Sequence, residues 1–171
     1  EHDWLPIHSA VMYKDSVHYI PLLAKEGVKH NVGGDDARGG LLLGGRCYVL
    51  QLLASNGDSS ETADLVYLDV MKKLRESKLL LREDIQDHDL MYFACSPDTP
   101  MRFEYLIDWC PEGLKTHQGN ELPLIHVIIE YRTIKCFSIF LKTALRYHPN
   151  DLGLLFLTAD EDQTACERAF T

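Results

Sequence analysis

The chain has 171 residues, of which 46% are hydrophobic and 25% charged. These proportions are typical of a globular protein and exclude wholesale disorder. Its 26 acidic and 17 basic residues give a formal net charge of −9. Nucleic acids and anionic membrane surfaces are bound mainly through Lys and Arg, so this balance argues against both as partners. No apolar run approaches the roughly 18 residues that span a bilayer, and we expect no direct membrane insertion.

The ends and the cysteines of the chain bear on its cellular context. The sequence begins at Glu1 without a Met and stops at Thr171 inside an expected helix, so we expect a fragment of a longer protein. No basic segment followed by an apolar one, the pattern of a secretory signal, opens it. The five cysteines show no CxxC or CxxH spacing, which favours buried, reduced thiols over a zinc site. We therefore predict an intracellular protein in a reducing compartment, with the organelle left open.

Short helices, most of them in pairs, are predicted along the chain from apolar residues at helical spacing. The predicted pairs are 5–12 with 16–25, 40–43 with 47–55, 89–95 with 101–109, and 122–131 with 134–147. Between the second and third pairs, Ser60 is expected to cap a longer helix at 62–76, where Leu65 belongs to the apolar face. A polar, Gly-rich loop is expected at 27–37, and a last helix begins near Thr164.

Several of these segments resemble one another, which indicates a repeat. LPIHSA at 5–10 matches LPLIHV at 122–127, and both place a Pro in the first turn of an apolar helix. Further starts are predicted at Arg38, Asp89 and Thr164, and the intervals from 5 to 38 and from 89 to 122 are both 33 residues. Helix pairs of this size cannot bury their apolar faces alone, so the pattern predicts stacking between neighbours.

The ends of the predicted helices also recur. Aromatic-x-Pro-x-x-Leu follows the helices that end at Trp109 and Tyr147, and a Pro there cannot continue the helix. Leu-Leu-Ala-x-x-Gly ends at Gly27 and again at Gly57. Each glycine is expected to supply a left-handed helix terminus.

The segment 5–10 resembles the ankyrin repeat, whose unit of about 33 residues carries T-P-L-H-x-A at its first helix. It keeps the Pro, His8 and the Ala of that motif, whereas the copy at 122 has Ile125 in place of the His and the copy at 89 has Tyr92. The chain is similar to divergent algal ankyrin-like proteins with irregular repeats. The resemblance implies an all-α fold, an α-solenoid of stacked helix-turn-helix pairs, in which the family His hydrogen-bonds backbone between repeats. An all-α array without β-turn fingers, closer to the TPR type, is the alternative.

The resemblance also implies the domain organisation. The chain would form a single ankyrin-like array over residues 1–171. Its approximate units are 1–37, 38–88 with an insertion at about 57–87, 89–121, 122–163 and a partial unit at 164–171. Whether the fingers are β-hairpins or plain loops stays open.

No enzyme or metal motif is complete in the sequence. The Gly-rich stretch 33–40 lacks the GK[ST] of a phosphate loop. The acidic groups at 84–89 and 160–162 lack the spacing of an EF-hand and are interpreted as solvated loops before helices. The eight histidines complete no HExxH or Cys-His signature, and His8 is interpreted as structural. We predict no catalytic residue, no metal and no cofactor. The aromatic residues predicted to lie in the core are Tyr13, Tyr19, Tyr48, Trp109, Phe137, Phe140 and Phe156.

These observations favour a non-enzymatic protein-protein interaction module or scaffold that uses an ankyrin-like solenoid surface. The alternatives are a structural subunit or spacer of a larger assembly and, less favoured, a hydrolase or nucleotide-binding enzyme. Because the chain is acidic, the expected partner is another protein with a partly basic surface, or neighbouring subunits of a complex. The loops between repeats are expected to make the contacts, through Asp35, Asp36, Arg38, His117, Gln118, Asn120, Asp160 and Glu161.

Overall fold

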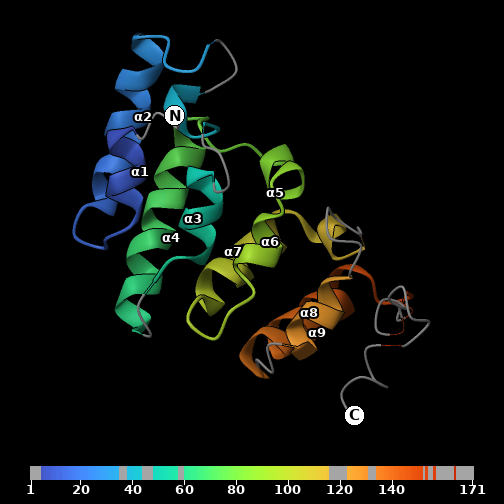
Figure 1. Ribbon diagram of the computed structural model, residues 1–171. Coiled ribbons are helices and arrows are strands. Elements are labelled where there is room, and N and C mark those ends of the chain that lie inside the picture. Colours follow the sequence, from blue (N-terminus) through green and yellow to red (C-terminus); the bar gives the residue numbers. More distant parts are fainter. Residues whose placement is uncertain are drawn as a thin grey trace. The chain divides into compact units, whose positions relative to one another are not determined.

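The computed structural model describes residues 5–34, 38–43, 48–57, 60–115, 123–130 and 134–151, together with the single residues 153, 156 and 164. Within these ranges every regular element is an α-helix or a short 3₁₀-helix, which confirms the all-α class for this part of the chain (Figure 1). The chain divides into two compact units, residues 1–81 and 82–171. No ankyrin repeat or solenoid is identified among the described residues, so the repeat array stays a prediction.

The described residues of the first unit form four α-helices. They are α1 (Pro6–Val11), α2 (Ile20–Lys29), α3 (Val49–Ser55) and α4 (Glu61–Glu76), with 3₁₀ turns η1 (Val17–Tyr19) and η2 (Arg38–Gly40). Helix α1 packs against α2 and α3, and α4 packs against α2, α3 and η1 (Figure 1). Apolar side chains from the four helices, from η1 and from Leu41 after η2 form the core, which includes Val11, Val17, Ile20, Leu41, Leu50, Leu53, Val70, Met71 and Leu74.

Identifiable caps begin α4 and end both α2 and α4, the two longest helices of this unit. Ser60 accepts a hydrogen bond from the backbone N–H of Ala63 at 3.2 Å, which confirms its predicted N-cap role at α4. Beyond the end of α4, Lys78 is left-handed (φ 58°), and the Leu79 N–H returns to the Leu74 carbonyl at 2.8 Å. Asn31 plays the same role beyond α2, at φ 53°. Both helices therefore end in Schellman motifs made without glycine.

The two glycines predicted to end helices do something else. Gly27 lies inside α2, and α3 ends before Gly57 at an extended residue, so the expected left-handed termini are wrong. A Cβ on Gly27 would lie 2.5 Å from the Gly39 carbonyl oxygen, and a Cβ on Gly39 would overlap the carbonyl of Ala24. Gly39 is also left-handed, at φ 68°. These glycines let the backbone of η2 pack directly on the backbone of α2.

The second unit contains five α-helices and one 3₁₀ turn among its described residues. They are α5 (Glu83–Asp87), α6 (Leu90–Phe93), α7 (Pro100–Trp109), η3 (Pro111–Leu114), α8 (Leu124–Glu130) and α9 (Ile134–Tyr147). Helix α9 packs against α7, α8 and η3, and α6 packs against α5, α7 and α8. Helices α7 and α9 end before Pro111 and Pro149, as the aromatic-x-Pro pattern predicts. The core of this unit includes Ile85, Leu90, Phe103, Leu106, Ile107, Leu114, Ile125, Ile128, Cys136 and Phe140.

Some predicted elements differ from the structure. The apolar run 40–43 forms no helix, because Arg38, Gly39 and Gly40 all have positive φ and end the 3₁₀ turn there. The acidic segment near residue 84 is not a solvated loop, since it forms α5 and buries Asp84 to 2% exposure. The predicted helix from Thr164 lies outside the described residues, apart from Thr164 itself, which is an isolated bridge residue and not helical.

Candidate functional site

A surface groove lies in the first unit between the loop that follows α1 and the first half of α4. It consists of two hollows, of about 380 Å³ and 600 Å³, that share Lys14 and Asp15. The first hollow is also lined by Met12, Tyr13, Asn56, Gly57 and Tyr67. The second is also lined by His18, Thr62, Leu65, Val66, Asp69 and Val70. We call these described residues together the α4 groove.

Hydrogen bonds hold the wall of the α4 groove in place. The carbonyl of Val11, at the end of α1, accepts from the Tyr67 hydroxyl at 3.0 Å and from the Asn56 amide at 3.2 Å. The Ser16 hydroxyl donates to the Ala10 carbonyl at 3.0 Å and to the Tyr13 carbonyl at 3.2 Å. Carbonyls at a helix end have no partner within the helix, so these side chains satisfy them and fix the loop.

The α4 groove exposes large apolar side chains. Tyr13 is 68% exposed and Leu65 is 45% exposed, and Met12 is also exposed beside them. The sequence pattern placed Tyr13 and Leu65 in the core, and the structure shows both to be wrong. Sites for protein segments commonly combine exposed apolar side chains with a few fixed polar groups.

The charges in the α4 groove are mixed. Its lining includes the basic side chains of Lys14 and His18 and the acidic side chains of Asp15 and Asp69. Asp69 also forms an ion pair of 2.6 Å with Lys73. No Ser or Cys nucleophile is among its described lining residues. Over the whole described part of the chain, no group of three or more His, Cys, Asp or Glu side chains could hold a metal ion.

Of the residues predicted to contact a partner, the structure describes Arg38 alone. Its guanidinium donates to the Leu79 carbonyl at 3.4 Å, so the side chain ties η2 to the segment that follows α4. Arg38 is half-buried and does not line the α4 groove. The other predicted contacts lie outside the described residues: Asp35, Asp36, His117, Gln118, Asn120, Asp160 and Glu161.

His8 is a structural residue, as interpreted from the sequence. Its side chain is buried, its Nδ1 accepts from the Leu5 N–H at 3.1 Å, and its Nε2–H donates to the Leu43 carbonyl at 2.7 Å. The ring thus joins backbone groups 38 positions apart along the chain. Because Nδ1 accepts a hydrogen bond, the contact with the Leu43 carbonyl requires the Nε2–H tautomer of His8.

Polar side chains in the second unit stabilise the turn η3. Arg82 forms an ion pair of 2.7 Å with Glu112, and Lys115 forms one of 2.8 Å with Asp151. Burial would raise the pKa of Glu112, but hydrogen bonds from its backbone and from the Cys110 thiol, together with Arg82, hold that pKa below its ordinary value. Burial, with Glu112 nearby, raises the pKa of Cys110, so this thiol stays protonated.

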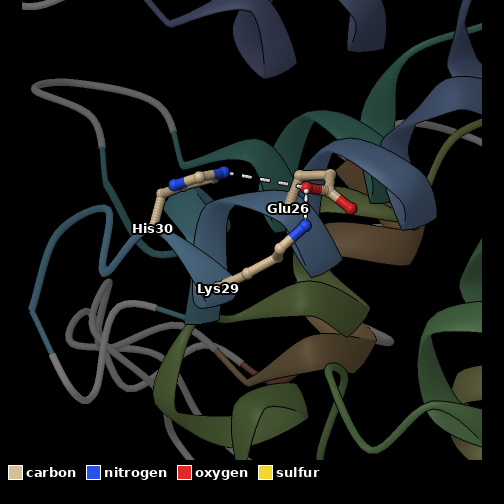
Figure 2. A network of polar contacts seen from close by, with 3 residues as sticks. All are labelled: Glu26, Lys29 and His30. Atoms are coloured by element: carbon tan, nitrogen blue, oxygen red, sulfur yellow. Dashed lines mark hydrogen bonds and ion pairs between the residues drawn. The ribbon is translucent and has the colours of Figure 1, made fainter.

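The cysteines and the surface of α2 show no further site. Cys95, Cys110 and Cys136 are buried, as predicted, whereas Cys47 and Cys166 lie outside the described residues. On α2, Glu26 contacts Lys29 at 3.2 Å and His30 at 3.8 Å (Figure 2). These three side chains are more than half exposed, and such surface pairs contribute little.

The fold and the groove define the class of the molecule as a small all-α protein with a preformed surface groove. Comparison with known proteins finds no family model that matches the chain, and no curated protein or solved structure that is significantly similar to it. Among the described residues, no helix combines the length and the apolar character that crossing a bilayer requires. The assignment of function therefore depends on the surfaces themselves.

Proposed function

We propose that the chain is a non-enzymatic protein-interaction module that binds an extended or helical segment of a partner protein in the α4 groove. The observation that carries the proposal is the exposure of Met12, Tyr13 and Leu65 along two hollows that share Lys14 and Asp15. A surface that exposes such side chains together marks an interaction site. Tyr13 adds a rigid apolar ring with a hydroxyl, a combination favoured at interfaces.

The rigidity of the groove favours binding over a merely exposed patch. Its wall at Val11 is fixed by donors from α3 and α4, so little ordering entropy is lost when a partner binds. The mixed charges of Lys14, Asp15 and Asp69 favour a segment with charges of both signs around its apolar anchors. The contact of His8 with Leu43 supports the ankyrin-like arrangement of the surrounding helices that we propose on the basis of the sequence.

A peptide selection tests this function. Phage-displayed random peptides are selected on the intact chain, and their affinities are measured for the wild type and for Leu65→Asp. Burying a leucine on binding contributes about 1.5–3 kcal/mol, so we expect a loss of affinity of about ten- to a hundredfold. Leu22→Asp on α2 is the matched control, because Leu22 is 58% exposed and lies outside the groove.

The outcome of the selection decides the proposal. Selected peptides should lose affinity for Leu65→Asp and keep it for Leu22→Asp, while both variants keep the wild-type circular dichroism. Peptides that bind wild type and Leu65→Asp equally well would show that the α4 groove is not the binding site.

A further inference from the structure

Helix α9 presents two apolar faces, of which only one is fully buried in the described structure. The face toward the core carries Cys136, Phe140, Thr143 and Ala144, all buried. A second stripe recurs at intervals of three and four residues and consists of Ile134, Phe137, Leu141 and Leu145. Ile134 is 84% exposed, Leu145 48% and Phe137 37%, and Leu141 is half-buried. We call these four residues the α9 stripe.

The charge of α9 is opposite to that of the whole chain. The helix contains Lys135, Lys142 and Arg146 and no acidic residue, whereas the chain has a net charge of −9. Lys135 and Lys142 are exposed and form no ion pair with any residue that the structure describes. Arg146 lies 3.8 Å from Asp108 of α7, over the ring of Tyr147. The helix therefore offers two exposed cations that have no neutralising carboxylate nearby in the described structure.

The order of the faces around α9 places the cations beside the α9 stripe. Successive helical residues turn by about 100°, so the stripe occupies a sector of about 80° between the core face and the face of Lys135, Lys142 and Arg146. From Ile134 to Leu145 the stripe runs about 16 Å along the axis at 1.5 Å per residue. That length matches about three turns of a helix lying alongside.

We propose that the α9 stripe binds an amphipathic helix of a partner protein whose apolar stripe is flanked by Asp or Glu. This inference rests on the proposed function, because it takes the chain to be an interaction module. It concerns a different surface, which lies in the second unit. Apolar residues at three- and four-residue spacing are the anchors of helix recognition, and the cations at its edge select carboxylates over amines. The expected partner at this face is thus acidic, although the net charge of the chain favours basic partners.

Two other occupants fit the charges less well. A second copy docking through the same face would bring Lys135 and Lys142 of each molecule close to those of the other. An anionic membrane would attract three cations but repel a chain whose net charge is −9. A separate acidic helix meets neither objection.

Two synthetic helical peptides test the proposal on the intact chain. Both carry a leucine stripe, which is flanked by Glu in the acidic probe and by Lys in the basic probe. We expect the acidic probe to bind at least about tenfold more tightly, and Lys135→Glu/Lys142→Glu to reverse that preference. Lys25→Glu/Lys29→Glu on α2 is the matched control, since it changes the net charge equally at exposed positions outside the α9 stripe. Ile134→Ser should weaken the acidic probe several-fold.

Each other outcome overturns the proposal. The two probes can bind equally, or the α2 control can weaken the acidic probe as much as the α9 charge reversal does. If Ile134→Ser abolishes sedimentation of the chain with phosphatidylserine vesicles, the α9 stripe binds a membrane. If it abolishes self-association of the chain, the α9 stripe binds a second copy. If Leu65→Asp abolishes binding of the acidic probe, the probe occupies the α4 groove and not the α9 stripe. That result would refute the proposal for α9 and leave the proposed function of the α4 groove intact.

Discussion

Replacing Gly39 by Ala tests the direct backbone packing of η2 on α2. Gly39 has φ 68°, and a left-handed conformation costs an L-residue about 1–2 kcal/mol. The new methyl group would also overlap the carbonyl of Ala24, and forcing extra volume into a packed contact costs about 1–3 kcal/mol. Against this, alanine lowers the entropy of the unfolded chain, which returns about 0.4–1 kcal/mol. We expect Gly39→Ala to lower the free energy of unfolding of the first unit by about 2–4 kcal/mol.

Gly34→Ala provides the matched control for this substitution. Gly34 is also left-handed, at φ 83°, but no atom lies within 4 Å of a Cβ built there. Its replacement carries the conformational strain without the overlap, so a loss of about 1 kcal/mol or less is expected. Urea unfolding followed by far-ultraviolet circular dichroism measures both variants, with unchanged m-values as the sign that only stability has moved. Equal losses in the two variants would refute the close approach of the two backbones.

Three further predictions concern hydrogen bonds and titratable groups. His8→Ala should lower the free energy of unfolding by about 2–5 kcal/mol in the same urea assay, because it leaves the Leu5 N–H and the Leu43 carbonyl without their partner. The pKa of Asp151 lies below its ordinary value of 3.8 because Lys115 donates to the carboxylate. The stabilisation from this pair is complete above about pH 4 and is lost as the pH falls through the lowered pKa. Asp151→Asn should therefore flatten the acid side of a plot of thermal stability against pH. An unchanged plot would contradict the pair. Because burial raises the pKa of the Cys110 thiol, iodoacetamide labelling located by mass spectrometry should be much slower at Cys110 in the native chain than in urea, and equal rates would rule out a protonated, buried thiol.

Local signals in the sequence predict most of the helices. Ser60 and the prolines after α7 and α9 act within one turn of chain, so their effects follow directly from residue type. The run 40–43 is apolar enough for a helix, but Gly39 has a positive φ and packs directly on Ala24 of α2, which no local pattern reveals. Segment 83–87 contains three acidic residues, and this composition led to the prediction of a solvated loop. The segment is a helix, and its Asp84 is buried.

The candidate sites could not be predicted from the sequence, because helical periodicity does not say which apolar face a neighbour covers. Tyr13 and Phe137 occupy apolar segments and were predicted to lie in the core, yet both are exposed, and only Phe140 of the seven predicted core aromatics is fully buried. One signal was available for α9, where apolar residues occupy more of the circumference than a single core contact needs. For the α4 groove, the turn between α1 and η1 had to be positioned by distant donors before its shape could be known.

The carbonyl of Val11 ties the shape of the groove to the order in which the chain folds. Its two donors, Asn56 and Tyr67, lie 45 and 56 positions further along the chain. Closing loops of that length costs entropy before any contact compensates for it, which slows the formation of such contacts. During synthesis, α1 leaves the ribosome well before α4 does, and the first hollow can be completed only after the chain has grown past Tyr67. The groove that we propose as a binding site is therefore complete only after most of the first unit has been made.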